Sequence, residues 1–343
     1  MIESRLHKSS SVQDEQKTYS NPATSVTVII VNWNSGLCLE RCLIQLLVQT
    51  YAPEVIQVID NASSDCSNTI ANRFEGVRLR DAGANLGFAV ANNLALSECS
   101  TEFVVLLNPD AFPSIDWLEH LVAAAKANPD IAAFGSRQLC QGSSEVLDGI
   151  GDSYHMSGLV WRERHGAQQQ AGDLVSQEIF SPCAAAALYR RQALVDVGGF
   201  DDDYFCYIED VDLGFRLRLA GHKAMYVPDA VVHHVGSATT GGQRSDFSVY
   251  HGHRNLVWTF VKNMPGALFW LLLPLHLLMN LATVGVFIAR GQGGVILRAK
   301  RDAIKGLPQM WAKRQQIQAR RVVTVREIWR VLDKRLIPRK QGR

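Results

Sequence analysis

A strand, a helix and a second strand follow one another near the start of the chain, and this order constrains the fold more than any other feature. The continuous β-branched run from Val26 to Val31 predicts a strand buried on both faces. A helical pattern follows over residues 36–49, and a second strand-like run covers residues 55–59. Parallel strands joined by a helix form a right-handed unit and bind ligands at their carboxyl ends. The sequence therefore predicts an α/β protein with its site at that edge of the sheet.

Length and composition narrow the class of protein. The 343 residues suffice for one large domain and an additional segment, and 35 Lys and Arg nearly balance 33 Asp and Glu, which argues against a nucleic-acid partner. Seven cysteines without CxxC spacing predict neither a zinc site nor a disulfide framework. Residues 1–24 are polar and lack periodicity, which predicts a disordered leader. Because no apolar run precedes Val26, we expect no secretory signal and a chain on the cytosolic side.

Polar residues follow the predicted strands at the expected sheet edge. Asp60 ends the second strand, where an acid can hydrogen-bond a base or a ribose, although capping of the next helix explains part of this stretch. Gly83 and Gly87 allow the backbone to approach a phosphate closely, but two glycines are a weak signal. The strand that begins near Thr101 stops at Asn-Pro-Asp, because proline cannot donate to a sheet. Asp110 at this place suits Mg²⁺ or Mn²⁺, and simple turn chemistry is the alternative.

A predicted helix beginning near Glu209 carries three acids in its first turn. The acids at residues 201–203 and nearby aromatic residues are expected to crowd it and raise the proton affinity of one carboxyl group until it can serve as a general base. The alternative is that the acids only complement the helix dipole, with Asp212 paired to Arg216. Further along, residues 132–177 lack periodicity, which predicts an irregular segment that either faces substrate or is an exposed loop.

The C-terminal part combines an apolar stretch with basic residues. From Asn263 to Ala289 there is no Asp, Glu, Lys or Arg, and this stretch is long enough to span a bilayer. A single crossing would place the catalytic region and the basic tail on opposite sides, which conflicts with the positive-inside rule. We therefore predict a re-entrant or interfacial helical pair bent at Pro274, with the tail on anionic lipid. A buried helix of a soluble protein is the alternative.

Six motifs, in this order and spacing, resemble the family 2 inverting glycosyltransferases, and especially the bacterial rhamnosyltransferases of cell-wall and surface-polysaccharide assembly. The motifs are VNWN (31–34), DNASSD (60–65), NLGFAVANN (85–93), LLNPDA (106–111), YIEDVDLGFRLRLAG (207–221) and AVVHHVGS (230–237). The resemblance implies a GT-A fold, a Rossmann-like mixed sheet flanked by helices. It implies a catalytic domain over residues 25–262 and a hydrophobic helical segment with a basic amphipathic tail over residues 263–343.

The resemblance also implies roles for individual residues. Asp210 would be the catalytic base, supported by Glu209, while Asp110 and His233 would hold Mg²⁺ or Mn²⁺. The family's Asp-Xaa-Asp motif has lost its first carboxylate here, because Asn108 stands in that place. The implied donor-binding residues are Asn32, Asn34, Asp60, Asn61, Asn85, Gly87, Asn108 and Asp110. The implied contacts to acceptor or phosphate are Trp161, Arg216 and Arg254.

The expected reaction is transfer of a sugar, L-rhamnose from dTDP-rhamnose, to a polyprenyl-diphosphate-linked or other glycan acceptor at the cytoplasmic face of the bacterial inner membrane. Two alternatives share the fold: an enzyme that uses a UDP- or GDP-sugar, and an inactive nucleotide-sugar-binding subunit of an assembly complex. A nicotinamide oxidoreductase would carry GxGxxG after its first strand, whereas this chain has only Gly36 there. A sugar-nucleotide pyrophosphorylase would need a glycine-rich, arginine-containing loop at the same turn, which is also absent.

Overall fold

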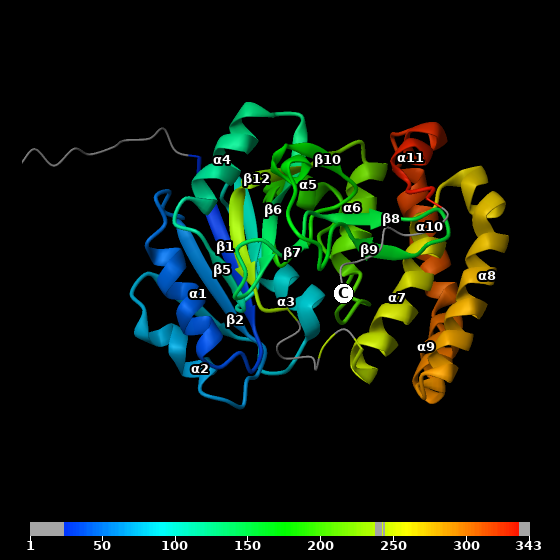
Figure 1. Cartoon of the computed structure of the whole chain (residues 1–343), viewed down its shortest axis with the longest axis horizontal. Coiled ribbons are helices and arrows are strands. Elements are labelled where there is room, and N and C mark those ends of the chain that lie inside the picture. The colour runs from blue at the N-terminus through cyan, green and yellow to red at the C-terminus, as the bar shows by residue number, and fades with distance from the viewer. Residues whose placement is uncertain (1–23, 237–241, 243, 336–343) are drawn as a thin grey trace, which may run out of the picture.

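The computed structural model describes residues 24–236, 242 and 244–335. Residues 1–23, nearly all of the predicted disordered leader, lie outside the described residues. A large mixed sheet forms the centre of the described part of the molecule (Figure 1). Its strands are β1 (Val26–Asn32), β2 (Val55–Asp60), β3 (Val77–Asp81), β4 (Phe103–Leu107), β5 (Ala111–Pro113), β6 (Ile131–Cys140), β7 (Leu147–Gly149), β10 (Gln177–Ile179), β11 (Ala186–Arg190) and β12 (Lys223–His234). A separate ribbon consists of β8 (Asp152–Tyr154) and β9 (Val160–Arg162).

The first half of the sheet is parallel, as predicted. β1 lies between β2 and β4, and β3 flanks β2. Ile29 of β1 belongs to one hydrophobic core, while Val28 and Ile30 belong to the core on the other face. Burial on both faces explains why this strand is a continuous apolar run. The strand register sets Asn32 directly beside Asp60 at the carboxyl edge.

The second half of the sheet contains both parallel and antiparallel strand pairs. Part of it lies in residues 132–177, which were predicted to be irregular. The first nine residues of that segment belong to β6, which lies between β11, antiparallel to it, and β12, parallel to it. β6 contains small residues because its neighbours approach closely: a Cβ on Gly135 would lie 3.0 Å from the Cβ of Pro182. Four of the ten residues of β6 are alanine, glycine or serine, which weakens its hydrophobic periodicity, so the sequence pattern missed the strand.

Helices cover both faces of the sheet (Figure 1). α1 (Leu37–Leu47) and α4 (Trp117–Ala127) pack on one face, and α3 (Gly87–Leu96) and α6 (Glu209–Leu219) pack on the other. The remaining short elements are α2 (Ser67–Ile70), α5 (Arg191–Asp196) and the 3₁₀ turns η1 (Ala71–Arg73) and η2 (Ala171–Leu174). This is the predicted layered α/β architecture.

The C-terminal helices gather beside α6, on one side of the molecule (Figure 1). They are α7 (Asp246–Asn263), α8 (Gly266–Ala289), α9 (Gly293–Lys305), α10 (Leu307–Ala319) and α11 (Val325–Val331). α8 continues through Pro274 as one helix, so the predicted pair bent at that residue is wrong. A proline inside a helix removes one hydrogen bond without having to end the helix. Among the described residues, α8 is long and apolar enough to cross a membrane, and only 11% of its most apolar window is buried.

Candidate active site

Asn32, Asp60 and Asn61 form a buried polar cluster where β1 and β2 end. The Asn32 side-chain amide donates to Asp60 Oδ1 at 2.7 Å, and the Asn61 backbone N–H donates to the Asn32 carbonyl at 2.8 Å. Asp60 Oδ2 accepts the Ser63 N–H at 3.0 Å. The Asn61 Oδ1 is buried without a hydrogen-bond partner among the described residues. Asn32 and Asp60 therefore brace this loop, while the Asn61 side-chain oxygen is left unsatisfied by the described residues.

Asn34, Asn85 and Gly87 shape the neighbouring loops. The Asn34 Oδ1 accepts the Ser64 N–H at 2.7 Å, and the Asn85 Oδ1 accepts the Gly87 N–H at 3.0 Å. Gly87 has a φ of 78°, and a Cβ there would lie 2.3 Å from the Phe205 carbonyl oxygen. Only glycine allows this approach, which brings the start of α3 against the loop that leads into α6.

Asp110 lies beside His234, which ends β12. The Nε2 of His234 is 3.3 Å from Asp110 Oδ1, and its Nδ1 is 2.9 Å from Asp148 Oδ2. His233, the residue predicted to share a metal with Asp110, does not lie beside it: it is half-buried on the other face of β12, near Arg41. Successive side chains on a strand point to opposite faces, so only one of the two histidines reaches Asp110.

The Asp110 carboxylate and the His234 imidazole could supply one oxygen and one nitrogen ligand to a divalent cation. Burial alone would raise the pKa of Asp110, but hydrogen bonding and charge from His234 lower it. Burial disfavours protonation of His234, yet Asp110 and Asp148 outweigh this and raise its pKa to about 9. The two residues could therefore hold a divalent cation, and because a histidine ligand must be neutral, binding of the cation would release the imidazole proton.

Asp148 and Arg162, which the sequence analysis missed, continue this contact chain into the protein. The Arg162 Nη1 lies 2.6 Å from Asp148 Oδ2, the same oxygen that contacts His234. The Arg162 Nε lies 3.7 Å from Asp152 Oδ1. Asp148 and Asp152 flank the glycines of DGIGD, and two acids within a glycine-rich stretch were the signal that could have revealed them.

Asp210 and Glu209 open α6, as predicted. The Asp210 Oδ2 accepts the Ala184 N–H at 3.2 Å, and Oδ1 accepts the Val211 N–H at 2.8 Å. Burial raises the pKa of Asp210. Burial, and then the charge of Asp210, raises the pKa of Glu209 well above its usual range, and the Glu209 Oε2 is buried without a hydrogen-bond partner among the described residues. A carboxyl group with raised proton affinity at a helix start is suited to act as a general base.

The turn into α6 is strained. Tyr207 and Ile208, neither of them glycine, have φ angles of 66° and 70°. The Asn255 side-chain amide of α7 donates to the carbonyls of Cys206 and Tyr207 at 3.0 and 2.7 Å. Positive φ at two successive large residues persists only where the surroundings hold it, and such strain concentrates at functional sites. Asn255 is therefore a further residue of the site that no sequence signal indicated.

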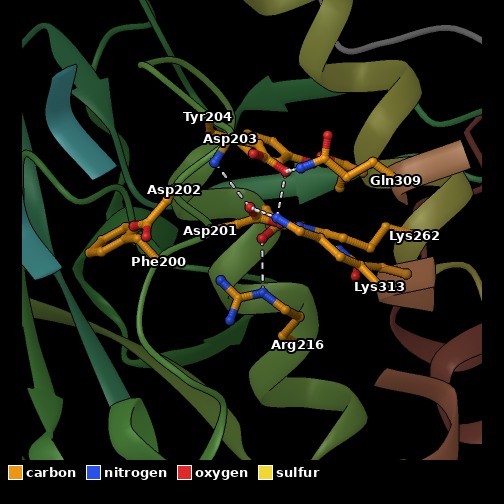
Figure 2. A network of polar contacts seen from close by, with 12 residues as sticks. Phe200, Asp201, Asp202, Asp203, Tyr204, Arg216, Lys262, Gln309 and Lys313 are labelled. Atoms are coloured by element: carbon orange, nitrogen blue, oxygen red, sulfur yellow. Dashed lines mark hydrogen bonds and ion pairs between the residues drawn. The ribbon is translucent and has the colours of Figure 1, made fainter. Parts of the chain in front are cut away.

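The acids before α6 do not crowd Asp210, which corrects the predicted source of its raised proton affinity. Lys262 of α7 and Lys313 of α10 both form ion pairs with Asp201 (Figure 2). Lys313 also lies 2.5 Å from Asp203, and Lys262 lies 2.7 Å from the buried Asp212. This network ties the segment before α6 to the C-terminal helices, so its role is structural.

The three predicted acceptor or phosphate contacts all have partners within the protein. Arg216 is 7% exposed, pairs with Asp212 at 2.8 Å and donates to two backbone carbonyls. It lines a cavity of about 650 Å³ between α6 and α10, whose lining includes neither Asp110 nor Asp210. Arg254 lies over the Trp258 ring at 4.2 Å, and Trp161 donates to Glu163 at 2.9 Å. Their contacts to substrate stay predictions, and for Arg216 the geometry argues against one.

Comparisons with known proteins agree with this geometry. A model of the family described as "Glycosyl transferase family 2" matches residues 27–198. The chain is 30% identical to N-acetylglucosaminyl-diphospho-decaprenol L-rhamnosyltransferase of Mycobacterium tuberculosis, over 65% of this chain and 80% of the relative. It is 25% identical to poly-beta-1,6-N-acetyl-D-glucosamine synthase of Staphylococcus aureus, over 74% of this chain and 60% of that protein.

Two solved structures share the fold. GalNAc-T7 with UDP, GalNAc and Mn²⁺ aligns with a TM-score of 0.57 at 15% identity over 70% of this chain, which spans about half (48%) of that one. The mannosyltransferase PcManGT from Pyrobaculum calidifontis, in complex with GDP-Man and Mn²⁺, aligns with a TM-score of 0.52 at 19% identity over 89% of this chain and 87% of that one. The predicted GT-A type fold is thus confirmed. With half of its length matched by the family model and its acids gathered at the sheet edge, the chain belongs to the family 2 glycosyltransferases, in the rhamnosyltransferase-like branch.

Proposed function

We propose that this enzyme transfers L-rhamnose from dTDP-rhamnose to a lipid-linked glycan at a membrane surface, with inversion at the anomeric carbon. The observation that carries the proposal is that one general-base carboxyl, Asp210, is connected to a cation-type site at Asp110 and His234. The connection runs through Asp152, Arg162 and Asp148. The similarity to a rhamnosyltransferase that acts on a decaprenol-linked acceptor supports the choice of donor and acceptor.

In this mechanism Asp210 takes the proton of the acceptor hydroxyl as that oxygen forms a bond to the anomeric carbon. The bond from this carbon to the diphosphate breaks, and the nucleoside diphosphate leaves with the electron pair. One base suffices for a direct displacement, so the configuration inverts. Burial, and then the charge of Asp210, raises the pKa of the neighbouring Glu209 well above its usual range, which favours its neutral form beside the base.

The donor would lie along the carboxyl edge of the parallel strands. The Asn61 Oδ1, which lacks a hydrogen-bond partner among the described residues, is the acceptor that we assign to the nucleoside. The Asn61 amide also donates to the Gly87 carbonyl at 3.0 Å, which ties the start of α3 to this loop. Asp110 and His234 would hold a divalent cation, Mg²⁺ or Mn²⁺, which when bound neutralises the developing charge on the departing diphosphate. Two fold relatives were solved with Mn²⁺ beside a nucleotide or nucleotide sugar, which supports this assignment.

We infer that α8 and α9 rest on the cytoplasmic face of the inner membrane, in its plane. Leu268, Phe269, Leu272 and His276 bury one side of α8 against the rest of the protein, and the His276 ring stacks on Phe260 at 4.0 Å. The opposite side of α8 exposes large apolar residues: Trp270, Leu271, Leu277, Leu278, Leu281, Val286 and Ile288. On α9, exposed Leu297 and Ile304 alternate with Arg298, Arg301 and Lys305. An apolar face bordered by basic residues is typical of helices that lie on anionic lipid.

Introducing charge on this face is expected to release the protein from membranes. The double variant Leu278→Glu/Leu281→Glu, at side chains that are 61% and 71% exposed, should lower the partition coefficient onto phosphatidylglycerol-containing vesicles by at least about tenfold, because both leucines would otherwise leave water. Vesicle co-sedimentation measures this. Ile44→Glu/Leu47→Glu on α1 is the matched control and should sediment like the wild type. Unchanged sedimentation of the α8 variant would contradict the proposed face.

The proposed reaction is tested with purified full-length protein, a panel of dTDP-rhamnose, UDP-sugars and GDP-sugars, and a prenyl-diphosphate-linked N-acetylglucosamine acceptor. We expect metal-assisted binding of dTDP-rhamnose in calorimetry and its transfer in product analysis by mass spectrometry. Transfer from a UDP-sugar instead would keep the enzyme class and replace the donor. Binding of no nucleotide sugar would contradict the proposal and favour an inactive subunit.

A further inference from the structure

The Asp210 carboxyl group shares its surroundings with a second buried acid. Ligand-type atoms of Asp152, Cys183 and Asp210 all lie within 4.8 Å of one another. Asp152 is 6% exposed and Cys183 is 4% exposed. Asp152 begins β8, Cys183 precedes β11 and Asp210 opens α6. The tertiary structure alone brings these three groups together.

The guanidinium group of Arg162 contacts two of these three residues, Asp152 and Cys183. Arg162 lies opposite Asp152 in the β8–β9 ribbon, with its Nε 3.7 Å from Asp152 Oδ1. The Arg162 Nη2 lies 2.6 Å from the Cys183 sulfur. A guanidinium group stays protonated at any physiological pH, so it supplies the positive charge that a metal ion would otherwise bring. We therefore interpret the cluster as a carboxyl pair with an arginine partner.

Two acids this close and this buried influence each other's ionisation. Burial, and then the charge of Asp210, raises the pKa of Asp152 to about 7, and burial raises that of Asp210. Such a pair loses its protons in two linked steps that belong to both groups. Burial keeps the Cys183 thiol and the Tyr189 phenol protonated. The titratable and charged groups that surround the pair are Asp148, Arg162, Cys183, Tyr189 and Glu209.

We propose that Asp152 is a positioning residue for the transfer reaction, which acts through Asp210 by orienting and electrostatically tuning its carboxylate. The proposal rests on the proposed function of Asp210 as the base. When Asp152 is ionised, its negative charge makes Asp210 a stronger acceptor for the hydroxyl proton. Arg162 holds Asp152 and at the same time holds Asp148, the partner of His234. One guanidinium group thus contacts both Asp152, the neighbour of the base, and Asp148, the neighbour of the donor-side histidine.

The test compares the pH dependence of kcat/KM in the wild type and in Asp152→Asn. We expect the wild-type rate to rise as the pH passes about 7, where the pair loses its second proton. Asn cannot ionise, so the rise near pH 7 should be absent from the Asp152→Asn profile, which should keep only a single rise at lower pH. Above pH 7, kcat/KM of the variant should be lower than that of the wild type by about tenfold or more. Asp152→Glu keeps the charge and should restore the step. A variant profile with the same shape as the wild type would overturn the proposal.

A matched control separates tuning from mere structural support. Asp173 is another buried acid, paired with Arg164 at 2.9 Å, whose contacts lie away from Asp210. Asp173→Asn should lower the melting temperature yet keep the step near pH 7. If Asp152→Asn behaves in the same way, with a uniform loss at every pH, its role is only structural and the proposal is overturned.

A titration of the protein without substrate tests the Asp152–Asp210 pair independently of the proposed function. Infrared difference titration should show one buried carboxyl group of the wild type losing its proton near pH 7. Asp152→Asn should remove that step, and Asp210→Asn, which takes away a neighbouring charge while the burial of Asp152 remains, should move the step to lower pH. A step that survives in Asp152→Asn, or that stays at the same pH in Asp210→Asn, overturns the pairing. An inactive wild type on every donor would overturn the proposed function, whereas the infrared step would still support or refute the pair by itself.

Discussion

Replacing Asp210 with Asn is expected to lower kcat by about 10²-fold to 10⁴-fold, which is the usual contribution of a positioned general base. Asn has nearly the same shape and can still accept the Ala184 N–H, now at 3.2 Å, so the turn into α6 should survive. Because the base contacts the acceptor and not the nucleotide, the dissociation constant of the donor should change by less than about threefold. Product formation gives kcat, and calorimetry gives the donor affinity.

Asp202→Asn is the matched control for this substitution. Asp202 lies in the segment before α6, is exposed and accepts the Asn93 side-chain amide at 2.7 Å. It should transfer sugar at the wild-type rate. Wild-type turnover by Asp210→Asn would remove Asp210 from the chemistry, and an equal loss in both variants would show that the effect comes from the loop and not from the base.

Replacing His234 with Ala is expected to weaken metal-assisted donor binding by about 10-fold to 100-fold, because the site loses a nitrogen ligand and the group that orients Asp110. Asp110→Asn should act in the same direction. The double variant should be no worse than the more severe single variant, since both side chains would serve one cation. Titration of Mn²⁺ into protein saturated with nucleoside diphosphate, followed by calorimetry, measures the affinity.

His233→Ala provides the control on the neighbouring residue of the same strand. Its side chain lies on the other face of β12, so the Mn²⁺ affinity should stay within about twofold of the wild type. Loss of metal binding in His233→Ala, with retention in His234→Ala, would contradict the assignment and restore the sequence-based choice. Metal-independent transfer in excess chelator would contradict a metal site altogether.

Local pattern was sufficient for the parallel half of the sheet. Val26 to Val31 was correctly predicted as a strand because burial on both faces demands a continuous apolar run. The acids at the start of α6 were also placed correctly, because the helical spacing of apolar residues that begins near Glu209 is a local property of the sequence. β6 was missed because its small residues are required by the close approach of Pro182 and Ile179 to Gly135. Both of these residues lie more than 40 positions away in the chain.

The choice between neighbouring side chains on a strand was beyond local pattern. His233 and His234 are chemically identical in sequence, and the position of Asp148 on β7 decides which of them is held beside Asp110. Trp161 and Arg162 form a similar pair of neighbours on β9. The sequence analysis chose the tryptophan, whereas the arginine is the residue that contacts Asp148 and Asp152.

The sequence by itself determined the family, the layered α/β fold and the elements that carry Asp110 and Asp210, because motif order, burial pattern and helix period are local properties of the chain. Only the tertiary structure decided that Asp201 and Asp203 anchor α7 and α10, and that Asp152 accompanies Asp210. The reason is physical: which charges share a buried space depends on packing between elements that are distant in sequence, and a carboxyl group's proton affinity follows from that shared space.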